Sequence, residues 1–112
     1  MDGLLLLHSL ETAIGYAGQG DFVLAEDGQL ARRESGGRAP FLFAGIQILH
    51  SRLFAEAPTG AFSLNVFYDR AIAARRLFGT VHRGSWCHVA TPSDIPRAEA
   101  FLRRSLEAEI AV

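Results

Sequence analysis

Short apolar runs separated by turn residues in the first half of the chain predict strands. The run Leu4 to Leu7 is apolar on both faces, as in an interior strand between two layers, although a buried helical turn would show the same periodicity. Residues 21–24 and 30–33 flank Asp27-Gly28, a hairpin signal because glycine accepts the positive φ of a tight turn. The apolar run 41–49 predicts a further strand.

The middle of the chain predicts an amphipathic helix followed by two strands. Ser63 is a plausible N-cap, and a shorter helical turn capped by Ser51 is expected before it. Apolar residues then recur at the i, i+3, i+4 spacing of one buried helix face: Leu64, Phe67, Tyr68, Ala71 and Ile72. Residues 77–81 and 86–89 have the composition of two strands joined by a turn at 83–85.

A last helix is predicted from a hydroxyl cap, a proline and an acid in the sequence Thr91-Pro92-Ser93-Asp94. Its apolar stripe consists of Ile95, Ala98, Phe101, Leu102, Leu106 and Ile110. The resulting order is strand, hairpin, strand, helix, strand, strand, helix. This order predicts one α/β domain, residues 1–112, with a mixed sheet.

Composition narrows the possible partners and setting. The 112 residues are 49% hydrophobic, enough to bury one core. With 11 basic and 12 acidic residues, the chain has no excess of positive charge that would attract nucleic acid or an anionic membrane. Leu4 to Leu7 is too short for a signal peptide or a membrane span. The single cysteine, Cys87, forms no internal disulfide and has no companion cysteines for structural zinc, which fits a reducing, cytoplasmic setting.

Three segments resemble, in order and spacing, the nucleoside-diphosphate-sugar pyrophosphorylase family. Gly20-Asp21-Phe22-Val23-Leu24 with the following Asp27-Gly28 resembles the family's hairpin after the glycine that touches the sugar. Residues 43–49, Phe-Ala-Gly-Ile-Gln-Ile-Leu, resemble its "x-x-G-I-x-I" strand. Residues 86–92, Trp-Cys-His-Val-Ala-Thr-Pro, resemble its "W-x-D-V-G-T-P". Residues 62–65, Phe-Ser-Leu-Asn, resemble the branch of N-acetylmuramate 1-phosphate uridylyltransferases and mannose 1-phosphate guanylyltransferases.

The resemblance covers only the second half of the family's pattern. It implies the C-terminal half of a nucleotide-diphospho-sugar transferase fold, which is Rossmann-like with a mixed sheet, and it makes residues 1–112 a single partial domain on the sugar-binding side. The glycine-rich loop of the amino-terminal nucleotide-binding half is absent from the sequence. The implied function is a fragment of an enzyme that converts a nucleoside triphosphate and a sugar 1-phosphate into a nucleotide sugar and pyrophosphate. We expect no catalytic residue in this half, no activity of the chain alone, and nucleotide binding only with the missing half.

The same resemblance identifies candidate site residues. Gly20 and Gly45 match positions whose backbone approaches the sugar, with a turn and a tight strand crossing as the alternatives. Asn65 either bonds to the substrate or supports the first turn of its helix. His88 occupies the position of an aspartate that helps to hold Mg2+ in the family. Imidazole suits softer metals than Mg2+, so His88 has either a metal-binding or a structural role. Ala90, where the family has glycine, is a second difference from the family's motif.

Two other functions compete with the enzyme fragment. One is a non-catalytic sugar-phosphate-binding or assembly module derived from the same fold, which the replacements at His88 and Ala90 favour. The other is a truncated product with no independent role. In all three cases half a sheet would expose a strand edge beside apolar surface, so we expect self-association. His8, His50 and His82 lack ligand spacing, which argues against a zinc site.

Overall fold

The computed structural model describes the backbone of residues 1–110 and the side chains of residues 1–107. Its five strands are β1 (Gly3–Ser9), β2 (Phe22–Leu24), β3 (Leu30–Arg32), β4 (Phe41–Leu49) and β5 (Leu77–Val81). Its helical elements are the 3-10 turns η1 (Ser51–Phe54) and η2 (Pro92–Asp94) and the helices α1 (Asn65–Ala73) and α2 (Ile95–Ile110). The predicted α/β fold with a mixed sheet is confirmed.

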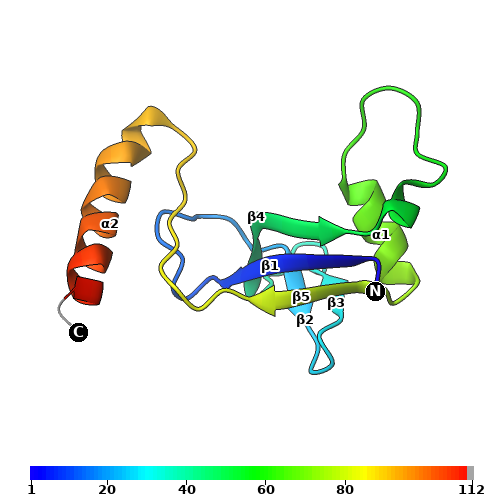
Figure 1. Cartoon of the computed structure of the whole chain (residues 1–112), viewed down its shortest axis with the longest axis horizontal. Coiled ribbons are helices and arrows are strands. Elements are labelled where there is room, and N and C mark those ends of the chain that lie inside the picture. The colour runs from blue at the N-terminus through cyan, green and yellow to red at the C-terminus, as the bar shows by residue number, and fades with distance from the viewer. Residues whose placement is uncertain (111–112) are drawn as a thin grey trace.

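The strands form one sheet in the order β3-β2-β4-β1-β5 (Figure 1). The central strand β1 pairs antiparallel with β4 and parallel with β5, which confirms that Leu4 to Leu7 form an interior strand. The β1–β4 register shifts between Leu5 and Leu7, which pair with Gln47 and Phe43. Gly45 lies in the resulting bulge of β4 with a φ of +94°. Glycine suits this bulge because it has no Cβ to oppose a positive φ.

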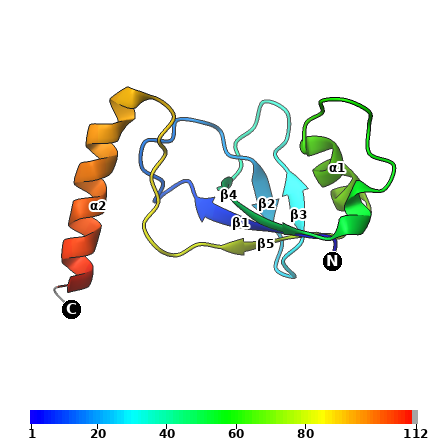
Figure 2. The same ribbon diagram turned by 45° about the horizontal axis from the view of Figure 1, so that its top comes forward.

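The predicted hairpin is present, and it folds the sheet back on itself. Gly28, at the turn between β2 and β3, has a φ of +90°. Its carbonyl accepts a hydrogen bond of 2.9 Å from the Gly79 amide in β5, and Gln29 forms an antiparallel bridge with Phe78. The two ends of the sheet therefore meet (Figure 2). The outer edge of β5 is therefore paired with the hairpin at Phe78 and Gly79.

The hydrophobic core lies between one face of the sheet and α1. The fully buried side chains at its centre are Leu5, Leu7, Phe22, Phe67 and Leu77. The predicted apolar stripe of α1 supplies Phe67, Tyr68 and Ala71 as buried residues. The helix begins slightly later than predicted, because Leu64 takes the cap position and the Ser63 hydroxyl accepts a hydrogen bond from the Asn65 amide.

Two local predictions were wrong in detail. Residues 86–89 do not form a strand: only Cys87 makes a bridge, with Ile14, because the backbone facing it is a loop that offers one residue in register. The turn η1 is capped by His50 rather than by Ser51, since the His50 Nδ1 accepts the Arg52 amide. The first difference depends on a distant backbone segment, whereas the second depends on a neighbouring histidine that the pattern of cap residues does not single out.

An ionic cluster joins the start of β1 to the helical side of the fold. The Asp2 carboxylate accepts hydrogen bonds from Arg76, at 2.8 Å, and from Arg52. The Arg76 hydrogen bond does most to lower the pKa of Asp2, and the Arg52 guanidinium adds to the shift although burial opposes it. The ends of β1, η1 and α1 are thereby tied together.

The last helix begins as predicted but leaves its apolar stripe uncovered. Thr91 and Asp94 form a capping box with Pro92 at the first helical position. Backbone hydrogen bonds from Ala90 and Thr91 lower the pKa of Asp94. Within the described side chains only Ala98 of the stripe is buried, whereas Leu102 and Leu106 are 50% and 57% exposed.

The helix α2 extends away from the sheet (Figure 1), which explains this exposure. Ile110, the last member of the predicted stripe, lies outside the described side chains. Among the residues that the structure describes, no helix combines the length and apolar character needed to cross a membrane.

Candidate functional site

The carboxyl ends of the parallel strands β1 and β5 meet at one edge of the sheet. Leu7 pairs with Val81, and His8 and His82 follow directly. Ligands of α/β proteins bind at the carboxyl ends of parallel strands, where the loops diverge. This edge is therefore the candidate position for a ligand site.

A pair of histidines, a buried His8 and a half-buried His82, lies at this edge. His8 is only 1% exposed, and its Nδ1 lies 3.2 Å from the Nδ1 of His82. On the other side of the ring, the His8 Nε2 lies 2.9 Å from the Thr12 hydroxyl. Burial lowers the pKa of His8, hydrogen bonding at Thr12 opposes this shift, and the neighbouring His82 adds to it. The arrangement favours a neutral His8 that is joined to His82 by one hydrogen bond between the two Nδ1 atoms.

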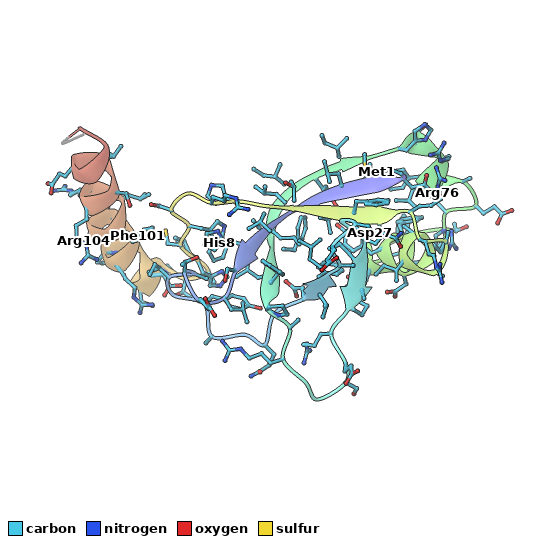
Figure 3. All side chains as sticks on the ribbon, turned by 90° about the horizontal axis from the view of Figure 1, so that it is seen from below. Met1, His8, Asp27, Arg76, Phe101 and Arg104 are labelled. Carbon is cyan, nitrogen blue, oxygen red and sulfur yellow. The ribbon has the colours of Figure 1, made fainter. Side chains whose placement is uncertain are left out.

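Aromatic rings connect the histidine pair to the motif around His88. The Trp86 ring stacks on His8 and on His88, with centroid distances of 5.7 and 6.2 Å. Tyr16 meets Trp86 and His88 edge-on, and its hydroxyl accepts a hydrogen bond of 3.2 Å from the Gly20 amide. Figure 3 places His8 at the end of β1, next to the loop that leaves β5. The fold thus brings His88 and Gly20 into one cluster.

The surroundings of His88 do not fit magnesium. The interactions of its ring are with the aromatic rings of Trp86 and Tyr16, whereas Mg2+ requires oxygen ligands in octahedral geometry. Across the described part of the chain, no group of three or more histidine, cysteine, aspartate or glutamate side chains is placed to hold a metal ion. We therefore assign no metal-dependent step to His88.

Sequence reasoning treated His8 and His82 as unrelated because 74 residues separate them. A signal was available, since each histidine directly follows an apolar run, Leu4 to Leu7 or Leu77 to Val81. Parallel pairing of those strands would place both side chains at the same edge. The pairing itself could not be read from the local pattern.

A cavity of about 380 Å³ lies beside the end of β1. Its lining residues come from the end of β1 and from the segment before β4: Ser9, Leu10, Glu11, Arg38, Ala39 and Pro40. A hydrogen bond of 3.0 Å from the Leu10 amide to the Pro40 carbonyl joins the two walls. The Arg38 guanidinium can pair with phosphate, and Ser9 and Glu11 can bind hydroxyl groups. This cavity can hold a small phosphorylated, hydroxyl-rich molecule.

Gly20 supports the wall of this cavity. It is buried with a φ of +82°, and a Cβ at this position would collide with the Ala39 carbonyl oxygen and approach the Phe41 oxygen to 3.2 Å. The next residue, Asp21, fixes the crossing, because its carboxylate accepts the Phe43 amide at 2.8 Å. This close approach of two backbone segments accounts for glycine at position 20.

Gly45 has a different environment. No heavy atom lies within 4 Å of the position that its Cβ would take, so its backbone faces open space. This is the arrangement expected where a ligand approaches the main chain. Gly45 is not among the residues that line the cavity beside β1.

Asn65 lies near the amino end of β1, with α1, and not with the histidine cluster (Figure 1). Its Oδ1 accepts a hydrogen bond of 2.9 Å from Arg32, whose Nε donates to Asp69 at 2.8 Å. The Arg32 guanidinium also lies over the Phe22 ring, 5.1 Å from its centroid. Asn65 therefore helps to fasten the hairpin to α1.

We expect Arg32→Lys to lower the free energy of unfolding by about 0.5 to 1 kcal/mol, because lysine keeps the charge but loses the planar fork and the ring stacking. Urea unfolding measures this change. Arg33→Lys is the matched control, since Arg33 makes one exposed bond, to the Gly37 carbonyl, that lysine can replace. Equal unfolding midpoints for the two variants would contradict the assigned role of Arg32.

Comparison with known proteins supports the resemblance that the motifs indicate. No family model matches the chain. The chain is 34% identical over 102 residues to an N-acetylmuramate alpha-1-phosphate uridylyltransferase of Caulobacter vibrioides. The match covers 91% of this chain but 42% of that relative, so the chain spans less than half of its length. The predicted relationship is confirmed: the chain is homologous to part of a sugar 1-phosphate nucleotidyltransferase.

Proposed function

We propose that this chain forms the sugar 1-phosphate-binding part of a nucleotidyltransferase and does not transfer a nucleotide alone. The observation that carries the proposal is the match of nearly the whole chain to less than half of a uridylyltransferase. Two structural features support it: the cavity that contains Arg38, at the carboxyl end of β1, and the open backbone at Gly45.

Each residue of the cavity has a proposed task. Arg38 pairs with the phosphate of the sugar 1-phosphate, because a guanidinium presents two parallel donors to phosphate oxygens. The Ser9 hydroxyl donates hydrogen bonds to sugar hydroxyls or accepts them, and the Glu11 carboxylate accepts them. Gly20 keeps the Ala39 wall in place. The cluster of Trp86, Tyr16 and the histidines closes the neighbouring edge of the sheet.

In the complete enzyme, an oxygen of the sugar phosphate attacks the α-phosphorus of the nucleoside triphosphate and pyrophosphate leaves. Such in-line transfer depends on positioning and on cationic groups around the phosphates, without a covalent enzyme intermediate. The sequence has no lysine, and Gly36-Gly37 is an exposed loop with no phosphate-binding pattern around it. We therefore expect the triphosphate, and the magnesium that accompanies it, to be held by groups outside the described residues.

The test is calorimetric titration of the 112-residue chain with N-acetylmuramate α-1-phosphate, mannose 1-phosphate, UTP and GTP. We expect a sugar phosphate to bind and both nucleotides to fail. Arg38→Ala should weaken sugar-phosphate binding by about tenfold or more, because a charged hydrogen bond contributes about 1.5 to 3 kcal/mol.

Arg103→Ala is the matched control, since it removes an exposed arginine from α2, whereas Arg38 lines the cavity. Unchanged binding in Arg103→Ala and weakened binding in Arg38→Ala would support the cavity as the site. Tight binding of UTP by the chain alone would contradict the proposal, as would equal affinities in the two variants.

The poor fit of His88 to magnesium favours a second candidate, a sugar-phosphate-binding module without chemistry. In that case the chain would bind the sugar phosphate but yield no nucleotide sugar when combined with a nucleotide-binding part. Formation of a nucleotide sugar in such a mixture would exclude the second candidate.

A further inference from the structure

On the sheet face opposite the core, apolar side chains of β1 and β4 stay exposed within the described part of the chain. In β1, Leu5 and Leu7 point into the core, so Leu4 and Leu6 point to the opposite face. They line a shallow cavity of about 110 Å³ together with neighbours from β4 and β5: Ile46, Gln47, Ile48 and Thr80. Ile46 and Ile48 are 65% and 70% exposed. We call Leu4, Leu6, Ile46, Ile48 and Thr80 the open sheet face.

The arrangement of the elements leaves this face bare. Figure 3 shows β1, β4 and β5 with no helix or other strand above them, whereas β2, β3 and α1 lie below. A group of apolar side chains that stays exposed on a sheet marks a surface suited to contact with another polypeptide. No charged residue lines the open sheet face, so the missing layer must be apolar where it makes contact.

Two observations indicate which kind of polypeptide covers the open sheet face. More than half of the Caulobacter relative has no counterpart in this chain, so the matched region of that enzyme is joined to a longer stretch of polypeptide that could cover such a face. The edge of β5 is engaged by the hairpin turn through the Gly79-to-Gly28 hydrogen bond, which obstructs strand-to-strand pairing with a second copy there. These observations favour a different polypeptide packed on the open sheet face over a second copy of this chain paired with the edge of β5.

We propose that the open sheet face binds the nucleotide-binding part of a nucleotidyltransferase, a polypeptide homologous to the region of the Caulobacter enzyme that this chain does not match. This inference rests on the proposed function, because it takes the partner from the same reaction. Ile46 and Ile48 would form the centre of the contact, since they are the most exposed apolar residues of the face.

The experiment co-expresses the 112-residue chain with the unmatched region of the Caulobacter enzyme, so that the two can fold together, and measures the complex by sedimentation velocity. We expect a one-to-one complex. Ile46→Asp should weaken it at least tenfold, and Ile48→Thr, which preserves strand propensity, should weaken it less. Val23→Asp is the matched control, because Val23 is an exposed apolar strand residue on β2, away from this face.

Circular dichroism of each variant confirms that it is folded. No complex with the wild-type chain, or equal affinity in Ile46→Asp and Val23→Asp, would overturn the inference. Self-association that Ile46→Asp abolishes would assign the face to a second copy and also overturn it. The sugar-phosphate titration separates the two proposals: binding without a complex refutes only this surface, and a complex without binding refutes only the proposed function.

Discussion

Gly20→Ala is expected to lower the free energy of unfolding by more than about 2 kcal/mol, whereas Gly45→Ala should cost about 1 kcal/mol. Both glycines have positive φ, which an alanine adopts at a cost of about 1 to 2 kcal/mol. At Gly20 the new Cβ also collides with the Ala39 carbonyl, which is backbone and cannot turn aside. At Gly45 the Cβ meets open space, so only the backbone strain remains.

Urea unfolding of the two variants, followed by tryptophan fluorescence and circular dichroism, measures the difference. Gly45→Ala serves as the control for backbone strain alone. If both variants lost the same stability, the tight crossing at Ala39 would not be the reason for glycine at position 20. If Gly45→Ala retained stability but lost sugar-phosphate binding, the open backbone at Gly45 would be a ligand contact.

Elements with a complete local pattern were predicted to the residue. The strands at 41–49 and 77–81 have the predicted bounds because turn residues delimit each apolar run. The Asp27-Gly28 turn was also correct, since its conformation depends on glycine itself. Local sequence is sufficient where the period of the apolar residues and the breaker residues agree.

Predictions that depended on a distant partner were less successful. Residues 86–89 have strand composition but make a single bridge, because a strand needs a neighbouring strand in register. The stripe of α2 indicates a buried face, yet Leu102 and Leu106 are exposed because the described part of the chain supplies nothing to cover them. A hydrophobic pattern shows that a surface is suited to burial, and it does not name the partner.

The candidate site was only partly predictable for the same reason. The motifs identified Gly20 and His88, which the structure joins through Tyr16. Arg38 was missed because it lies in a loop without a motif, and its cavity is formed only when that loop meets the end of β1. Asn65 was selected by resemblance, but its amide oxygen is engaged by Arg32 at the other end of the sheet.

The stability of the protein should fall as the pH drops from about 7.5 to about 5.5, and His8 should cause much of this loss. The ordinary histidine pKa of 6.5 is lowered in the folded state because His8 is buried. In this range the unfolded chain therefore binds more protons than the folded chain, and protons favour unfolding. The contribution of the neutral His8 is fully present above pH 6.5 and is lost as the pH falls through the lowered pKa of the folded state.

His8→Gln removes this titration while leaving a polar side chain to face Thr12 and His82. We expect the variant to be about 1 to 2 kcal/mol less stable at pH 7.5, because hydrogen bonds of a buried group are disturbed, and to lose less stability than the wild type at pH 5.5. Asp2 and Asp94 do not obscure the comparison, since their contributions remain in full above their ordinary pKa of 3.8. His50→Gln is the matched control, because it removes an exposed imidazole and leaves an amide oxygen that can accept the Arg52 amide at the start of η1. Urea unfolding at the two pH values measures how much unfolding free energy each protein loses between pH 7.5 and pH 5.5. If His8→Gln lost as much as the wild type, or if both variants reduced the loss equally, His8 would not govern the dependence of stability on pH.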